Sequence, residues 1–174
     1  PLHESYEKFY SFSREQAIQA VSYYREYYEE KGMFENEVYP GIKELLRVLT
    51  KQGILCLVAT SKPEIYAKKI LDYYKLRTYF HYIAGANMDG TRTDKAEVIA
   101  YALKQIPAEY NNKKILMVGD RSHDIIGAKK NGIDCAGVLF GYGSREELEE
   151  AGADFVADSV EAVRNIILLD TAMN

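Results

Sequence analysis

The sequence predicts an α/β protein built on a doubly wound parallel sheet. Short apolar runs, typical of buried parallel strands, alternate with segments whose apolar residues recur at helical spacing. Signals for helix starts and ends lie between these runs. The chain has 174 residues, 47% of them hydrophobic and 28% charged, which is enough for a sizeable core. Strands alternating with helices favour right-handed crossovers, and ligands of such sheets bind beyond the carboxyl ends of the strands.

The N-terminal segment is expected to be helical. Ser13 to Gln16 has the form of a capping box that starts a helix, and Gly32 lies where that helix should end. This helix carries four tyrosines, Tyr23, Tyr24, Tyr27 and Tyr28. They could line a binding cleft, although packing of an amphipathic helix is the favoured interpretation.

After Tyr39-Pro40-Gly41 the pattern changes to alternating strands and helices. The expected strands are 54–59, 80–84, 115–118, 133–139 and 155–157. The expected helices are 42–52, a helix from a second capping box at Ser61 to about Tyr74, 94–105, 124–131, a short helix capped by Ser144, and 159–168.

Composition excludes several classes of protein. The net charge is −4 without a basic face, which argues against nucleic acid as a partner. No apolar run approaches about 18 residues and no signal peptide is visible, so we expect no membrane span and a cytoplasmic location. The natural N-terminus is left open, because the sequence starts at Pro1. Cys56 and Cys135 lie in apolar runs and are interpreted as buried core residues.

Residues suited to phosphoryl transfer lie at the ends of two expected strands and at the start of one expected helix. Thr60 and Ser61 end an apolar run, Lys95 begins a helix, and Asp120 and Asp124 follow the next apolar run. In a parallel sheet these groups face one rim. A threonine hydroxyl, helix-opening amides and a lysine can neutralise phosphoryl oxygens, while carboxylates suit magnesium.

Each of these residues has a simpler interpretation when taken alone. Thr60 could cap a helix, Lys95 could be a solvated helix residue, and the aspartates could be favoured by a helix N-terminus. Their combination, in this order along the chain, is the specific signal.

At these positions the sequence resembles the haloacid dehalogenase-like hydrolases, in particular the branch similar to phosphoglycolate phosphatases. LVATSKP at 57–63 matches the second motif of the family, TRTDKAE at 91–97 the third, and MVGDRSHDI at 117–125 the fourth. Tyr39-Pro40-Gly41 is also typical of the family, and the resemblance extends over essentially the whole chain.

The resemblance implies a role for each of these residues. Thr60 would bind the transferring phosphoryl group, with Ser61 as a further substrate contact, and Lys95 would bridge the phosphoryl oxygens and the nucleophile. Asp120 would be a direct Mg²⁺ ligand, and Asp124 either a second ligand or a partner that orients Lys95. Two further residues of the motifs, Lys62 and His123, could lie near substrate or have no specific role.

The resemblance also implies a Rossmann-like core with part of a helical cap. Residues 1–38 would be the C-terminal half of the cap, and residues 39–174 a core lacking its first strand. The first motif of the family, Asp-x-Asp-Gly-Thr, supplies the nucleophile and the general acid and base. It is absent here, and the nearest look-alike, Asn87-Met88-Asp89-Gly90-Thr91, is interpreted as a turn.

We therefore expect the first motif to lie upstream of Pro1. Its strand would be central, between the strands that end at Thr60 and Asp120, and without it two inner edges would lack backbone partners. An upstream segment, a swapped neighbour or a separate fragment should fill this position.

The expected function is that of a Mg²⁺-dependent phosphatase acting on a small phosphorylated metabolite, either phosphoglycolate-like or nucleotide-like. The chain alone should be inactive. A sugar phosphomutase of the same superfamily is one alternative, and a non-catalytic binding or regulatory module is another if Pro1 is the natural start. A dinucleotide-binding domain is disfavoured, because no Gly-x-Gly-x-x-Gly follows a strand.

Overall fold

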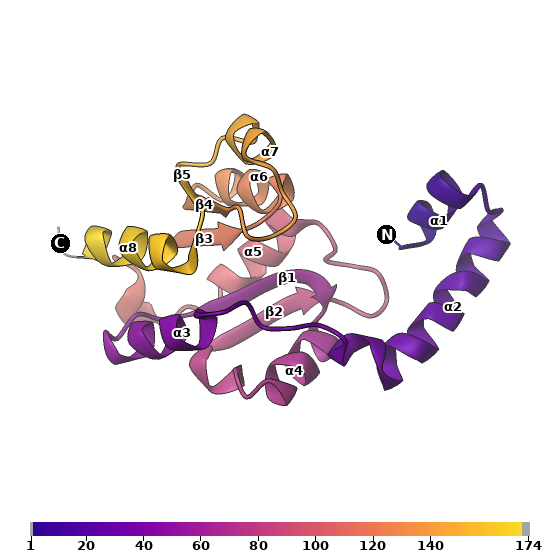
Figure 1. Ribbon diagram of the computed structural model, residues 1–174, viewed down its shortest axis with the longest axis horizontal. Coiled ribbons are helices and arrows are strands. Elements are labelled where there is room, and N and C mark those ends of the chain that lie inside the picture. Colours follow the sequence, from indigo (N-terminus) through magenta and orange to yellow (C-terminus); the bar gives the residue numbers. More distant parts are fainter. Residues whose placement is uncertain (1, 172–174) are drawn as a thin grey trace.

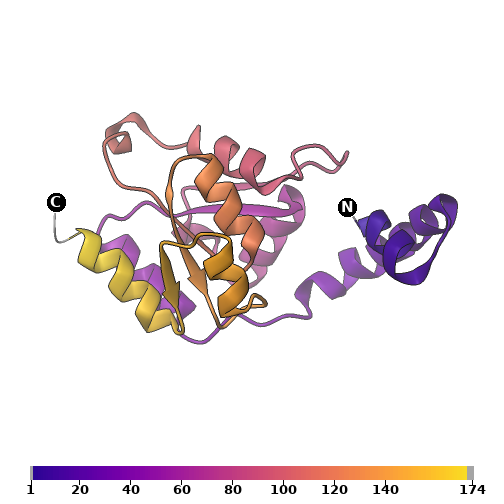
Figure 2. The same ribbon diagram turned by 90° about the horizontal axis from the view of Figure 1, so that it is seen from above.

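The computed structural model describes residues 2–171 and shows an α/β body from which a helical arm projects (Figures 1 and 2). The arm comprises α1 (Leu2–Tyr10), α2 (Arg14–Glu30) and the single turn η1 (Gly32–Phe34). The expected capping box opens α2, because the Ser13 hydroxyl accepts the Gln16 amide and the Gln16 side chain accepts the Ser13 amide.

The body alternates strands and helices, as expected. Its strands are β1 (Leu57–Pro63), β2 (Tyr82–Ala86), β3 (Leu116–Gly119), β4 (Asp134–Val138) and β5 (Phe155–Ala157). Its helices are α3 (Ile42–Lys51), α4 (Glu64–Tyr73), α5 (Lys95–Leu103), α6 (Ser122–Lys130), α7 (Arg145–Glu150) and α8 (Val160–Thr171), with single turns η2 (Arg77–Tyr79) and η3 (Ala108–Tyr110). All strand pairs are parallel, which confirms the α/β class.

The strands form two separate sheets, with the orders β1-β2 and β3-β4-β5 (Figure 1). Within residues 2–171, β1 pairs only with β2, and β3 pairs only with β4. The burial of the strands points to the same break. Most residues of β2 and β4 are buried, whereas no residue of β1 or β3 is, and Val118 in β3 is 37% exposed. Inner strands of a doubly wound sheet are normally the most buried. The exposure of β1 and β3 therefore indicates that the facing edges of these two strands lack a neighbouring strand.

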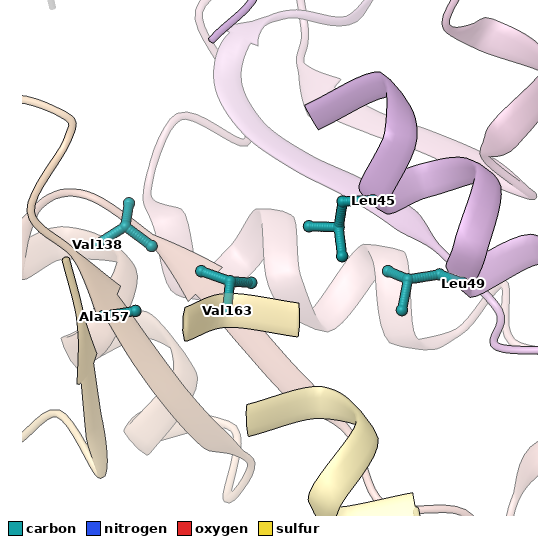
Figure 3. Packing of buried hydrophobic residues seen from close by; sticks show 5 residues of the cluster. All are labelled: Leu45, Leu49, Val138, Ala157 and Val163. Atoms are coloured by element: carbon teal, nitrogen blue, oxygen red, sulfur yellow. The ribbon is translucent and has the colours of Figure 1, made fainter. Parts of the chain in front are cut away.

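A shared apolar cluster is one of the links between the two sheets. Leu45 and Leu49 of α3 pack with Val138 of β4, Ala157 of β5 and Val163 of α8 (Figure 3). Helix α3 leads into the first sheet yet packs against the second. This shared apolar cluster therefore fixes one half-sheet relative to the other.

Two expected boundaries are wrong. The strand expected at 54–59 runs instead from Leu57 to Pro63, and the helix expected from Ser61 begins at Glu64 without a side-chain cap. Ser61 is therefore an exposed strand residue and not a helix cap. The reason is pairing, because β1 resumes its ladder with β2 at Pro63 beyond a bulge.

No helix in the described part of the chain is both long and apolar enough to span a membrane. Cys56 and Cys135 are free thiols, and Cys135 is fully buried in β4. Burial raises the pKa of both thiols. Cys135 is the buried core residue that was expected, whereas Cys56 is only partly buried and lies just before β1.

Candidate active site

Lys95 of α5 links the end of β1 to the first turn of α6. The Lys95 ammonium donates to the Ala59 carbonyl at 3.1 Å and pairs with Oδ1 of Asp124 at 2.9 Å. The Lys95 and Asp124 side chains are only 15% and 9% exposed. Lys95 thus spans from the end of β1 to the segment after β3, across the two unpaired strand edges.

Asp124 uses both carboxylate oxygens within the protein. While Oδ1 pairs with Lys95, Oδ2 accepts the amides of Asp120 at 3.1 Å and Arg121 at 3.2 Å. A Cβ at Gly119 would lie within 2.5 Å of this carboxylate, so glycine leaves the space that Asp124 occupies. These contacts support an orienting role toward Lys95, while direct metal ligation by Asp124 stays a prediction.

Asp120 is held by the loop that follows β4. Its Oδ2 accepts the amide of Tyr142 at 2.9 Å. A Cβ at Gly141 would lie 2.3 Å from the Asp120 Cβ, and one at Gly143 would lie 2.2 Å from the Asp120 carbonyl oxygen. No sequence pattern indicates that this glycine-bearing loop packs on Asp120.

The donor set fits part of a magnesium site. Asp120 offers a hard oxygen at the rim, and Mg²⁺ is usually held by one or two carboxylates together with water and substrate phosphate. Within residues 2–171 no group of three or more His, Cys, Asp or Glu side chains is arranged to hold a metal. The two predicted ligands differ in how much of the carboxylate is already used. Both oxygens of Asp124 have protein partners, whereas in the described part of the chain only Oδ2 of Asp120 accepts a hydrogen bond.

Thr60 lies at the end of the regular ladder of β1. Its Oγ1 accepts the amide of Lys62 at 3.2 Å. The hydroxyl proton has no acceptor among the described residues, so it remains available to a phosphoryl oxygen. Ser61 is exposed beside it.

A contact from α7 supports the start of α6. Oε1 of Glu147 accepts the Ser122 amide at 2.8 Å and the Arg121 Nε at 2.9 Å. The Ser122 amide, followed by Arg121, lowers the pKa of Glu147 to about 2. Sequence spacing could not reveal this contact, because it joins residues 25 positions apart. His123, on the same turn of α6, is exposed.

The nucleophile look-alike is a turn, as expected. Oδ1 of Asp89 accepts the Thr91 amide at 2.9 Å and the Thr91 hydroxyl at 2.7 Å, which is an Asx-turn. These hydrogen bonds lower the pKa of Asp89. Asp89 is exposed and serves the turn between β2 and α5.

Comparison with known proteins shows the family of the chain. The profile of the Haloacid dehalogenase-like hydrolase family matches residues 1–138. A structure of a putative phosphatase from Clostridium difficile is 48% identical, with a TM-score of 0.88, and the match covers 96% of this chain and 77% of that one.

Curated relatives carry several names. The 5'-nucleotidase of Pseudomonas aeruginosa is 38% identical over 169 residues, which cover 96% of this chain and 75% of that protein. Tyrosine-protein kinase PtkA of Mycobacterium tuberculosis is 37% identical over 88% of this chain, but the chain spans only 53% of its length. Phosphoglycolate phosphatase of Vibrio vulnificus is 29% identical over 90% of this chain.

The names 5'-nucleotidase and phosphoglycolate phosphatase confirm the predicted class, a hydrolase of phosphoric monoesters, and the resemblance to the phosphoglycolate phosphatase branch. The family profile matches residues 1–138, and a relative is 38% identical over 96% of this chain and 75% of its own length, so the chain belongs to the haloacid dehalogenase-like hydrolases.

Proposed function

We propose that this chain is the larger part of a Mg²⁺-dependent phosphatase that hydrolyses small-molecule phosphate monoesters through an aspartyl-phosphate. The observation that carries the proposal is the position of Lys95. A buried carboxylate holds its ammonium at the rim, between the ends of two strands whose facing edges are both unpaired. A fixed cation at this point stabilises negative charge that develops on a phosphoryl group.

The unpaired edges of β1 and β3 leave room for a strand that could carry the nucleophile. One extra parallel strand between β1 and β3 would join the two sheets and end at the rim beside Lys95. We infer that such a strand, from a segment upstream of Pro1, carries the attacking aspartate. A swapped neighbour or a separate fragment could supply the same strand.

The chemistry then proceeds in two displacements. An oxygen of the strand's aspartate forms a bond to phosphorus as the bond to the leaving oxygen breaks, and a second carboxylic acid on that strand protonates the leaving oxygen. Water then attacks phosphorus and gives a proton to the second carboxylate, as the bond between phosphorus and the aspartate oxygen breaks to release phosphate and the free aspartate. Throughout, Thr60 donates to a phosphoryl oxygen and Lys95 neutralises charge. Mg²⁺, held partly by Asp120, would supply further charge neutralisation when bound.

Substrate class rests on the names of the relatives alone. One is named a 5'-nucleotidase and another a phosphoglycolate phosphatase, so both nucleotide-like and phosphoglycolate-like esters are candidates. The alternatives are a sugar phosphomutase on the same scaffold and, if no added strand exists, a non-catalytic module. The buried Lys95–Asp124 pair has no evident use in such a module.

The test uses the full-length parent protein with Mg²⁺ and a panel of phosphate monoesters. Lys95→Ala and Asp120→Ala should each lower kcat by at least about 100-fold, because each removes charge stabilisation of the transition state. Lys104→Ala is the control, since Lys104 is exposed at the other end of α5. Turnover like that of the wild type in either Lys95→Ala or Asp120→Ala would contradict the proposed phosphatase function.

A further inference from the structure

A bulge redirects the chain just beyond Thr60. In the ladder of β1 with β2, Thr60 lies opposite Gly85 and Pro63 lies opposite the next residue, Ala86. Ser61 and Lys62 therefore have no partner on β2, and both are exposed. Bulges of this kind re-aim side chains and are frequent beside active sites.

The bulge is a packed feature of the fold. A Cβ at Gly85 would lie 2.6 Å from the backbone of Glu64 and 2.7 Å from the Lys62 carbonyl oxygen. Glycine at this position therefore lets the bulged segment lie directly on β2. The direction in which Lys62 leaves the sheet is thus set by close backbone packing.

Lys62 is a cation without an anionic partner in the described part of the chain. Its ammonium hydrogen-bonds the hydroxyl of Tyr28 and lies 4.7 Å from the centroid of that ring. A phenol leaves the charge of the ammonium uncompensated. In contrast, Lys68 and Lys129 each pair with a carboxylate at 2.5 Å.

Tyr28 is itself held in place at the end of the arm. Its ring stacks on Tyr24, with centroids 5.3 Å apart, and meets the ring of the buried Tyr66 edge-on at 5.6 Å. The Tyr66 hydroxyl in turn donates to Glu29. The Tyr28 ring already contacts Lys62, Tyr24 and Tyr66. We therefore interpret Tyr28 as a residue that positions Lys62, and not as a surface on which a substrate ring stacks.

We propose that Lys62 binds an anionic group on the leaving-group side of the substrate, and that Tyr28 positions its ammonium. This inference rests on the proposed function, which places the phosphoryl group at Thr60. The Lys62 amide contacts the Thr60 hydroxyl, so the chain turns from the phosphoryl position directly to Lys62. The substrate class is a short phosphate monoester with a second negative charge, such as a carboxylate, near the ester oxygen.

The experiment compares two esters in the full-length parent protein. Phosphoglycolate and ethyl phosphate share the P–O–CH₂ unit and differ in a carboxylate against a methyl group. Lys62→Met should lower kcat/KM for phosphoglycolate about 10- to 100-fold, mostly through KM, because a charge-assisted hydrogen bond is lost. It should leave ethyl phosphate within about 2-fold. Tyr28→Phe, which removes the hydroxyl and keeps the ring, should lower only the phosphoglycolate value, and by less.

Further variants separate recognition from folding and from catalysis. Lys62→Arg keeps the positive charge and should retain most of the preference for phosphoglycolate, while Lys104→Met should change neither ester. Equal losses on both esters in Lys62→Met, or none, would overturn the inference. A wild type that prefers adenosine 5'-monophosphate, whose leaving group is neutral, would overturn it as well. The proposed function fails separately if the wild type hydrolyses none of these esters with Mg²⁺.

Discussion

The ion pair of Lys95 and Asp124 is the residue-scale feature that ties the fold to the chemistry. Both side chains are largely removed from water, and Asp124 also accepts two backbone amides. A buried ion pair adds little net stability over a well-packed apolar pair, because desolvation offsets the attraction. Its use is therefore better explained by function, since it fixes a positive charge at the rim.

The substitution Asp124→Asn tests the ion pair between Lys95 and Asp124. The amide keeps the shape of the side chain but leaves the buried Lys95 ammonium without its carboxylate, so the free energy of unfolding should fall by about 3 kcal/mol. Adding Lys95→Met should recover part of the loss, because the unpaired charge is gone. Urea unfolding at pH 7 measures both changes.

Asp134→Asn is the control for this pair, because Asp134 is exposed at the start of β4, and it should cost less than about 0.5 kcal/mol. Strictly additive losses in the Asp124→Asn, Lys95→Met double variant would contradict a coupled pair.

Sequence spacing could predict the rim residues but not what holds them. Thr60, Lys95 and Asp120 follow apolar runs or begin helices, and parallel strands bring such positions to one edge. The amide of Tyr142 that binds Asp120, and the carboxylate of Glu147 that binds the start of α6, arrive from loops and helices distant in sequence. Only the tertiary packing of the second sheet places them.

At the scale of elements, periodicity located every strand of the body, while boundaries failed where two local signals compete. Ser61 satisfies the pattern of a helix cap, yet β1 extends past it to pair Pro63 with Ala86. That pairing depends on glycine at position 85, on another strand, so the local sequence of β1 could not reveal it. Where no such competition exists, as at Ser144 before α7, the expected cap is found.

Helix α7 should couple to α6 in a pH-dependent way through Glu147. Hydrogen bonds from Ser122 and Arg121 lower the pKa of Glu147 to about 2, below the value of about 4.3 expected in the unfolded chain. A lowered carboxylate pKa stabilises the fold above the unfolded pKa, and this stability is lost as the pH falls from about 4.3 toward 2. Glu147→Gln should therefore be less stable than the wild type at pH 7, with the difference shrinking by pH 3.

The measurement is urea unfolding of both proteins at pH 7 and pH 3. Glu150→Gln serves as the matched control, because Glu150 is exposed on the same helix. A difference between Glu147→Gln and wild type that does not change with pH would show that the carboxylate charge plays no part in this contact.

At the scale of the whole molecule, the body is two half-sheets held together by helices. The cluster of α3, α8 and the second sheet joins them on one side (Figure 3), and Lys95 spans them at the rim. The missing first motif predicted unpaired inner edges, and the structure has them on β1 and β3. Their effect on burial, which leaves Val118 37% exposed, follows from the three-dimensional arrangement.

A polypeptide of residues 1–174 should therefore be weakly cooperative in unfolding, and the inner strands should be its least protected part. Backbone amides of β1 and β3 that face the unpaired edges should exchange with solvent faster than those of β2 and β4. A longer form that carries the proposed upstream strand should protect both inner strands together and raise the melting temperature, because one parallel strand pairs with both edges and covers apolar side chains.

Hydrogen exchange measures the amide protection of the 1–174 polypeptide and of the longer form, and circular dichroism measures their melting temperatures. Amides of β2 and β4 that bond within each half-sheet are the internal control, since they should be protected in both forms. A sharp, high-temperature transition of the 1–174 polypeptide, with β1 and β3 as protected as their neighbours, would contradict the added strand. In that case the two half-sheets would be a complete fold, and the proposed source of the nucleophile would be lost with it.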